Sequence, residues 1–359
     1  MTKVALVCAF NPGNTGMYSV DLAASRFMRT LGVPHRLINF QRRPWRPVLG
    51  FRSTRDVKYL KTFTHLLFWG DFQNNPVYGT KDFAKRELKF KYASSDKEAI
   101  SNWSRLHLDI ADHLHGVKIA SVGNCFLGAG TAAADKGLGL SLRNFVRNAS
   151  AILPRESQSM QQLTDASEPS PNIATGLDTA FLLDGSNQRD YRDKKNIGFR
   201  FVRSDVVDVD AGIAELAKAT GLSPVEIPWT TGDRKTSCKK VFAQAIAAIA
   251  TCRVVVTDVY HLAVNATNHG TPVICLSRGD YDASSSVADA KKHALAEQIG
   301  TLDLHVTLTP DGSLLPSSKA IVDAYQSLMD RQIDFDDIMQ GLQSQKSGFR
   351  DRIIEIIES

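Results

Sequence analysis

The stretch Arg253–Cys275, which reads RVVVTDVYHLAVNATNHGTPVIC, limits the possible folds more than any other part of the chain. Val254–Val256 is a β-branched apolar run with the length of a buried strand. From Val259 onward, apolar residues recur at three- and four-residue spacing, which predicts a short helix. Gly270 provides a helix stop, and a second apolar strand follows over 273–276. Strand, helix and strand in this order predict a parallel βαβ unit.

The N-terminus of this predicted helix belongs at the carboxyl edge of the sheet, where open α/β folds bind their ligands. Free N–H groups and the helix dipole favour anions at that place. Asp258 is a favoured N-cap residue, and Tyr260 and His261 fall in the first turn. The dipole favours a neutral imidazole, which suits a general base or a hydrogen-bond donor. His261 and Asp258 are therefore the candidate catalytic residues; local capping or packing is the alternative for His261.

The chain as a whole predicts two α/β domains. It has 359 residues, and strand–helix alternation continues on both sides of a polar stretch over 184–196. We therefore expect a Rossmann-like domain over 1–184, a second one over 185–333 and a final amphipathic helix over 334–359.

Composition is that of a globular protein without a membrane span. Apolar residues make up 43% of the chain and charged residues 23%. No apolar run is long enough to cross a bilayer, and the apolar stretch at the N-terminus is too short for a signal peptide. The five cysteines are scattered and show no metal-ligand spacing. We expect reduced cysteines, a cytoplasmic location, no metal and no cofactor.

The net charge of +5 is placed unevenly. Basic residues crowd the stretch 36–61, which has a single acid, Asp56. Its central part, Arg42–Arg55, fits either a solvated loop or a surface for an anionic partner. That partner would be the inner face of a membrane, contacted peripherally, or a phosphate-bearing acceptor. No nucleic-acid-binding motif accompanies the basic stretch, so we do not expect nucleic acid as a partner.

Cationic side chains also lie at or just beyond the ends of several predicted strands. A guanidinium at such a place can reach a bound carboxylate or phosphate. The residues concerned are Arg155, Arg200, Arg203 and Arg278. For Arg155, a salt bridge with Glu156 or another acid is the alternative.

The pattern VVVTD-x-YHLAVNA-x-x-x-G-x-P-x-I resembles the signature near the C-terminal end of the polysaccharide pyruvyl transferase family. Arg155-Glu156-x-x-Ser159 resembles the family's Arg-Glu-x-x-Ser segment, and Asp178–Phe181 its Asp-x-Ala-Phe segment. The family form has Arg-Leu-His after the strand Asp, where this chain has Val259-Tyr260-His261. The histidine is thus retained and the arginine is absent.

The resemblance implies a GT-B-like architecture, with an acceptor-side and a donor-side domain facing each other across a cleft. It also implies that the last helix packs back on the N-terminal domain. The implied acceptor-binding residues are Asn14, Asp71 and Asn74, and the implied donor-binding residues are Arg155, Arg200, Arg203, Tyr260 and Arg278. Because Val259 replaces the family's arginine, we expect another cation beside His261, supplied by Arg200, Arg203, Lys235 or Arg278.

The activity implied by the resemblance is transfer of a pyruvyl group from phosphoenolpyruvate to hydroxyls of a glycan or lipid-linked saccharide. The product is a ketal of a surface polysaccharide. Such chemistry requires cations for the donor, a proton donor for its methylene carbon and a base for the attacking hydroxyl. Two other classes stay open because the fold hosts many functions. They are a GT-B glycosyltransferase that uses a nucleotide sugar and a non-catalytic carbohydrate-binding member of the family.

Overall fold

The structure, a computed structural model, describes residues 1–9, 13–41, 49–185, 190–231, 236–278 and 287–359. The chain divides into two units, each of which is described by itself. Unit 1 comprises Met1–Pro12, Val20–Leu182 and Ser347–Ser359, and unit 2 comprises Gly13–Ser19 and Leu183–Lys346. The passage after Leu182 lies beside the predicted boundary at 184, whereas the return to unit 1 comes at Ser347, later than the predicted 334.

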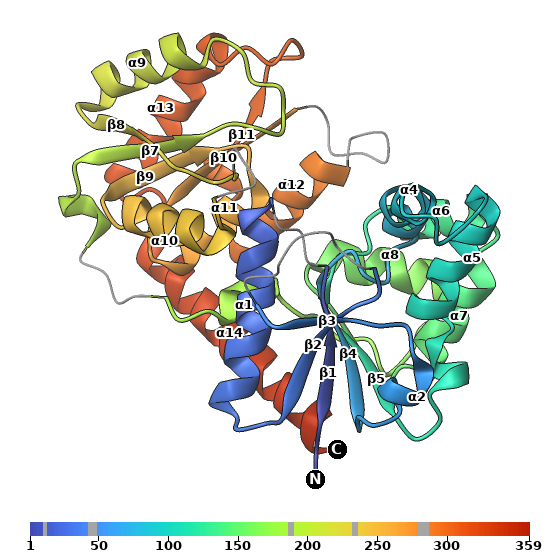
Figure 1. The fold of residues 1–359 in the computed structure, drawn as a ribbon. Coiled ribbons are helices and arrows are strands. Elements are labelled where there is room, and N and C mark those ends of the chain that lie inside the picture. The colour runs from blue at the N-terminus through green and yellow to red at the C-terminus, as the bar shows by residue number, and fades with distance from the viewer. Residues whose placement is uncertain (10–12, 42–48, 186–189, 232–235, 279–286) are drawn as a thin grey trace. The chain divides into compact units, whose positions relative to one another are not determined.

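Unit 1 contains a six-stranded parallel sheet (Figure 1). Its strand order, β3-β2-β1-β4-β5-β6, is that of a Rossmann fold. Its central strands are buried except at the first residue of β5 and the last residue of β4, because helices cover both faces of a parallel sheet. The strands are β1 (Val4–Val7), β2 (His35–Asn39), β3 (Phe51–Ser53), β4 (His65–Asp71), β5 (Lys118–Asn124) and β6 (Ala151–Pro154).

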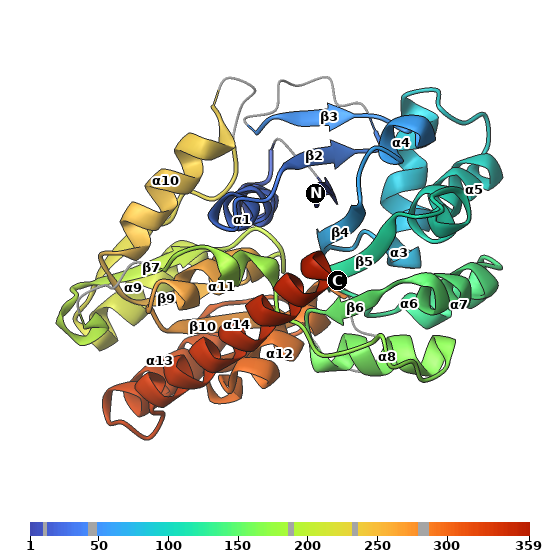
Figure 2. The same ribbon diagram turned by 90° about the horizontal axis from the view of Figure 1, so that it is seen from below.

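The helices of unit 1 lie on both faces of its sheet. Figure 2 shows α5 and α7 on one face and α1 and the end of α14 on the other. The helical segments are α1 (Thr15–Thr30, of which the first turn belongs to unit 2), α2 (Val57–Leu60), α3 (Pro76–Tyr78), the π-helical η1 (Gly79–Phe83), α4 (Ala84–Lys89), α5 (Asp96–His107), η2 (Ile110–His113), α6 (Ala129–Asp135), α7 (Gly139–Asn148), α8 (Ser157–Ser167) and η3 (Thr179–Leu182).

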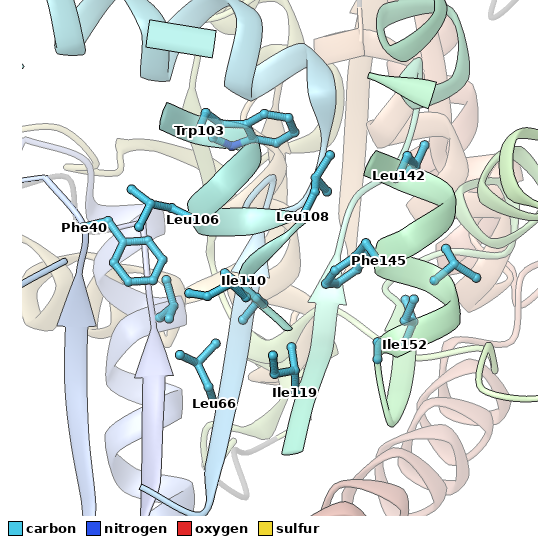
Figure 3. Close-up of a cluster of buried hydrophobic side chains, with 14 of the residues drawn as sticks. Phe40, Leu66, Trp103, Leu106, Leu108, Ile110, Ile119, Leu142, Phe145 and Ile152 are labelled. Atoms are coloured by element: carbon cyan, nitrogen blue, oxygen red, sulfur yellow. The ribbon is translucent and has the colours of Figure 1, made fainter. Parts of the chain in front are cut away.

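The main core of unit 1 lies between the sheet and the helices α5 and α7 (Figure 3). Leu66 and Ile119 come from neighbouring strands, Trp103 from α5 and Phe145 from α7, and all four are buried. Alternate residues of the strands face this layer, as the two-residue period of a strand requires. The sheet thereby keeps a fixed carboxyl edge from which functional loops extend.

The opposite face of the same sheet is covered by α1 and by the last turns of α14 (Phe335–Glu358). Trp69 packs on Phe27 of α1, with 5.9 Å between the ring centroids. Arg350 of α14 lies over the ring of Phe27, and Arg352 donates to the carbonyl oxygen of Thr175 at 2.6 Å. The predicted return of the final helix to the N-terminal domain is therefore confirmed.

Unit 2 contains a five-stranded parallel sheet in the order β11-β10-β9-β7-β8. Helices α9 and α13 cover one face, and α10, α11 and α12 cover the other (Figure 1). The strands are β7 (Asn196–Arg200), β8 (Ser223–Glu226), β9 (Cys252–Thr257), β10 (Val273–Arg278) and β11 (His305–Leu308). The helical segments are η4 (Tyr191–Asp193), α9 (Val209–Thr220), α10 (Cys238–Ile249), α11 (Tyr260–Asn268), α12 (Val287–Ile299), η5 (Leu302–Leu304) and α13 (Leu315–Met329).

The predicted fold class is confirmed: both units are α/β layers built on parallel sheets. The βαβ unit expected over Arg253–Cys275 is present as β9, α11 and β10. Gly270 follows α11 with φ 70°, a left-handed conformation that costs glycine little. Within the described residues, no helix has the length and apolar character needed to span a bilayer. That the two domains face each other across a cleft stays a prediction.

Candidate functional site

The parallel register of unit 2 brings several of the predicted residues to one edge of its sheet. Arg200 at the end of β7 is opposite Thr257 at the end of β9, and Thr257 is opposite Cys275 in β10. The turns that leave these strands therefore start side by side. The turn after β7 carries Arg203, and the turn after β9 leads through Asp258 into α11.

Asp258 holds the turn that follows β7. It is 1% exposed, and its carboxylate accepts from the backbone N–H groups of Val202 (2.9 Å), Arg203 (2.7 Å) and Ser204 (2.6 Å). Three backbone donors occupy this carboxylate, so the structure gives Asp258 an anchoring position in place of the predicted catalytic one. The predicted N-cap is also corrected, because Val259 occupies the N-cap position of α11.

His261 lies in the first turn of α11, as predicted, and is 7% exposed. Its ring packs against Gly16 so closely that a Cβ added to Gly16 would lie 2.7 Å from both the Cβ and the Nδ1 of His261. Glycine at position 16 is thus required by a close approach rather than by a turn. Asn265 Nδ2 donates to the carbonyl oxygen of His261 at 2.7 Å and to Ser19 Oγ at 3.1 Å. These contacts attach the first turn of α1 to α11 within unit 2.

Tyr260 is 4% exposed and stands edge-on to His261, with 5.1 Å between the ring centroids. The Nζ of Lys291 lies 5.2 Å from the centroid of the Tyr260 ring, which places a cation on the face of the aromatic side chain. The ring thus fixes one side of the imidazole. A direct contact of Tyr260 with a pyruvyl donor stays a prediction.

Two of the four cations expected near His261 are bound elsewhere. Arg200 pairs with Glu226 of β8, and its Nη2 donates to Thr230 Oγ1 at 3.3 Å. Arg278 Nη2 donates to the backbone carbonyl oxygens of Asp205 (3.2 Å) and Asp311 (2.9 Å), so it connects two loops. Both arrangements favour structural positions for these side chains. A third candidate, Lys235, lies outside the described residues.

Arg203 differs from these two arginines because its side chain is exposed. Among the described parts of unit 2, its guanidinium makes no ion pair. Its backbone is nevertheless held, since its N–H group donates to Asp258. Arg203 therefore combines a fixed backbone with a guanidinium available to an anion.

Asn14, predicted to bind the acceptor, directly precedes α1. Its Oδ1 accepts from the N–H groups of Gly16 (2.9 Å) and Met17 (3.3 Å), which is the hydrogen bonding of a helix cap. The cap places the first turn of α1, and with it Gly16, against His261. Asn14 thus contributes to the site of unit 2 through the backbone that it holds.

In unit 1, Arg155 follows β6 as predicted but is enclosed. Its side chain is 0% exposed, its Nε lies 2.9 Å from Glu156 Oε2, and its Nη1 lies 3.6 Å from Asp178 Oδ2. The guanidinium also lies over the ring of Phe72, with 5.3 Å to the centroid. Two carboxylates already balance this cation, so the structure favours the salt-bridge alternative over binding of a pyruvyl donor.

The other predicted residues of unit 1 divide between core and edge. Asn74 is 0% exposed; its Nδ2 donates to the carbonyl oxygen of His107 (2.7 Å) and its Oδ1 accepts from Ser121 Oγ (2.9 Å). The structure therefore gives Asn74 a structural role in place of the predicted acceptor contact. Asp71 ends β4, is half-buried and adopts φ 58°, a strained backbone for a residue other than glycine. Its contact with an acceptor stays a prediction.

The predicted anionic-partner surface Arg42–Arg55 is described only in part, because residues 42–48 lie outside the described residues. Arg55 pairs with the fully buried Glu87 and also donates to the carbonyl oxygen of Phe40 at 2.6 Å. Arg52 lies over the ring of Tyr59, 3.7 Å from its centroid. Both side chains thus contact other groups of unit 1, and the membrane contact stays a prediction.

Three residues that were not predicted from the sequence as functional contact the turn after β7 or one another beside it. They are Ser204, Asp289 and Lys292, all buried in unit 2. Asp289 and Lys292 have the (i, i+3) spacing of a helical ion pair, but Lys291 beside Lys292 looks the same in sequence. Burial alone distinguishes the two lysines. Among the described residues, no group of His, Cys, Asp and Glu side chains is arranged to hold a metal ion.

Several solved structures are similar to this chain in fold. A UDP-N-acetylglucosamine 2-epimerase from Neisseria meningitidis is similar at 10% identity, with a TM-score of 0.52 and 99% of each chain covered. MnaA from S. aureus, solved with UDP, is similar at 12% identity with a TM-score of 0.51, over 99% of this chain and 95% of the other. HepE from Anabaena, solved with UDP and glucose, is similar at 13% identity with a TM-score of 0.50 over 100% of both chains. At such identities the likeness shows the fold alone.

The strand orders and the edge residues therefore define a two-unit α/β protein built on parallel sheets. The family model described as polysaccharide pyruvyl transferase matches residues 94–281, slightly more than half of the chain. The chain belongs to the polysaccharide pyruvyl transferase family, which is a family of transferases. No curated protein matches the chain.

Proposed function

We propose that this protein transfers a pyruvyl group from phosphoenolpyruvate to two hydroxyls of a glycan. In this reaction the two hydroxyl oxygens form bonds to C2 of the donor, and the bond from C2 to the phosphate oxygen breaks. The methylene carbon gains one proton, equivalent to one of the two hydroxyl protons, and becomes a methyl group. The other hydroxyl proton leaves with inorganic phosphate. The products are a pyruvate ketal and phosphate, without any oxidant or reductant.

The observation that carries the proposal is the arrangement at the sheet edge of unit 2. His261 begins α11, and the turn with the exposed Arg203 is tied to Asp258, three residues before His261. A helix N-terminus and a guanidinium attract the carboxylate and phosphate of the donor. An imidazole at the same edge suits a proton transfer to the methylene carbon. Family membership supports the choice of this chemistry.

Arg203 is the cation that we propose in place of the family arginine missing at Val259. Arg200 and Arg278 already serve other groups, and Arg155 is balanced by two acids. Phosphoenolpyruvate carries up to three negative charges, so we expect Arg203 to act with the positive end of the α11 dipole. The pyruvyl donor accordingly binds to unit 2.

We further propose that the acceptor is a glycan or lipid-linked saccharide bound on the side of unit 1, near Asp71. A lipid-linked acceptor would bring the protein to the inner membrane face through Arg42–Arg55. Reversing the charge of Arg42, Arg43 and Arg46 should then weaken binding to anionic vesicles at low salt, where electrostatic attraction is strongest. Unchanged binding would contradict a membrane contact and support the alternative that Arg42–Arg55 is a solvated loop.

A nucleotide sugar is the second candidate for the donor. The fold neighbours MnaA and HepE, which were solved with UDP, favour this reading through the fold they share with this chain. A member that only binds carbohydrate is the third candidate. The sequence around α11 favours the first, because the family signature retains His261 and carries no nucleotide-binding fingerprint.

Ligand titration of the full chain decides among the three candidates. Phosphoenolpyruvate, UDP-sugars and GDP-sugars are titrated while the unfolding temperature is measured, because a ligand that binds only the folded state raises it. Stabilisation by phosphoenolpyruvate alone, followed by phosphate release when an acceptor glycan is added, is the expected result. Stabilisation by nucleotide sugars alone would contradict pyruvyl transfer and support glycosyl transfer. No stabilisation by any of these donors would support a protein that only binds carbohydrate.

A further inference from the structure

A buried ion pair of α12 lies directly beneath the turn that carries Arg203. Lys292 is 1% exposed, and its Nζ lies 2.6 Å from Asp289 Oδ1. The same Nζ donates to Ser204 Oγ at 2.8 Å, and Ser204 Oγ donates to Asp289 Oδ1 at 3.1 Å. Ser204 itself is 3% exposed. Lysine is rarely buried to this extent, so its contacts require an explanation.

The contacts of Ser204 join three elements at one point. Its hydroxyl binds the ion pair of α12, and its backbone N–H donates to Asp258, which precedes α11. Ser204 comes directly after Arg203 in the turn that leaves β7. The turn is therefore attached on one side to the base of α11 and on the other side to α12. A displacement of Ser204 would move Arg203 relative to His261.

Stability alone explains this arrangement poorly. A buried ion pair loses the hydration of both charges, and apolar residues of similar volume often stabilise a fold as well or better. What a charged network adds is a fixed geometry, since each of its hydrogen bonds is satisfied in one arrangement only. In this protein the charged network fixes the geometry of the turn 202–204, which carries Arg203.

We propose that Ser204, Asp289 and Lys292 are positioning residues that hold Arg203 and the N-terminus of α11 in one anion-binding arrangement. They act on the pyruvyl donor through the turn 202–204 and do not touch the donor. The identity of the bound anion rests on the proposed function. The positioning of the turn rests only on the contacts of Ser204, Asp289 and Lys292. Small displacements matter at such a site, because binding and transfer depend on the placement of charges within about an ångström.

The test uses the full chain with Lys292→Met and Ser204→Ala. Lys346→Met is the matched control: Lys346 also lies in unit 2 and its Nζ donates to Asn268 Oδ1 at 2.8 Å, away from the turn. Hydrogen exchange is measured at the amides of residues 202–204 and, as an internal reference, at those of β9. Exchange reports local opening independently of any ligand. KM and kcat for phosphoenolpyruvate are measured on the same variants.

We expect at least tenfold faster exchange at residues 202–204 in Lys292→Met and Ser204→Ala, with β9 unchanged. KM for phosphoenolpyruvate should rise at least tenfold while kcat stays within about threefold, and Lys346→Met should resemble the wild type. Ser204→Ala, which removes only a hydroxyl, decides the matter if Lys292→Met does not fold.

Unchanged exchange at 202–204, or equally faster exchange in β9, would overturn the positioning role, because the network would then serve only general stability. A wild-type protein that neither binds nor turns over phosphoenolpyruvate would instead overturn the proposed function. The exchange measurement would still decide the positioning role in that case.

Discussion

The carboxyl edges of the two sheets differ in the sign of the charged side chain that is buried there. In unit 1 the cation Arg155 is enclosed, with the carboxylates of Glu156 and Asp178 around it. In unit 2 the enclosed charge is the anion Asp258, which three backbone N–H groups of the turn after β7 surround, and the cation Arg203 is exposed. Both edges occupy the same topological position, at which α/β folds bind ligands.

This difference shows that an arginine beyond a strand end is not by itself an anion site. Arg155 stabilises the turn in which it lies, because its charge is balanced inside unit 1. Arg203 can serve a ligand because other groups hold its turn in place. The comparison leads to four predictions, of which the largest concerns unit 1.

Arg155→Met should lower the free energy of unfolding of unit 1 by about 3–5 kcal/mol, since it leaves two buried carboxylates without their cation. Chemical denaturation monitored by Trp69 and Trp103 measures this loss. Arg200→Met is the control: its partner Glu226 is 60% exposed, so a loss below about 1 kcal/mol is expected. Equal losses in both variants would contradict the comparison.

His261→Ala should reduce turnover by ~10²-fold or more if the imidazole transfers a proton, while the dissociation constant of phosphoenolpyruvate changes little. Phosphate release under saturating donor and acceptor measures turnover. The matched control is His269→Ala at the other end of α11, which should keep its turnover. A His261→Ala protein with wild-type turnover would remove this residue from the mechanism.

Arg203→Met should weaken binding of phosphoenolpyruvate by about tenfold, which corresponds to about 1.4 kcal/mol. Its effect on stability should stay within about 0.5 kcal/mol, because the side chain is exposed. Calorimetric titration and thermal unfolding give the two values. Arg155→Met, in contrast, is expected to change mainly the free energy of unfolding. A loss of stability without a loss of affinity in Arg203→Met would therefore show that Arg203 has a structural role like that of Arg155.

Buried histidines should make the stability of both units depend on pH. Burial lowers the pKa of His107 in unit 1 to about 3, and that of His269 and His305 in unit 2 to about 4. As the pH falls below about 6.5, the unfolded chain gains protons that the folded chain does not bind, so stability is lost down to about pH 4. Each histidine contributes about 1.4 kcal/mol per pH unit.

NMR titration of the histidine rings measures this effect, and these three rings should stay neutral between pH 8 and pH 5. A buried ring that titrates near pH 6.5 would contradict the assigned burial.

Much of the fold was predictable because it depends on local patterns. The apolar run Val254–Val256 became β9, and the three- and four-residue spacing after Val259 became α11. Helix α8 was not predicted. Its buried residues Ser159, Leu163 and Ser167 recur every four positions, but only one of them is apolar, so no hydrophobic period is visible.

Less of the site was predictable. The position of His261 in the first turn of α11 followed from the sequence, as did the place of Arg155 just after a strand. The roles of Asp258 and Asn74 did not, because their partners come from other turns and strands. Gly16 likewise gains its importance only from His261, which is far away in the chain.

The sequence by itself determined much of the secondary structure, including the parallel βαβ unit, and the family, because periodicity and short motifs are local properties. Only the tertiary structure decided which charged groups are enclosed and which are available to a ligand. The contact of Lys292 with Ser204 joins residues 88 positions apart, and that of Arg155 with Asp178 joins two separate turns. The physical reason is that burial and pairing of a charge depend on the surroundings that folding assembles, which residue type and spacing do not specify.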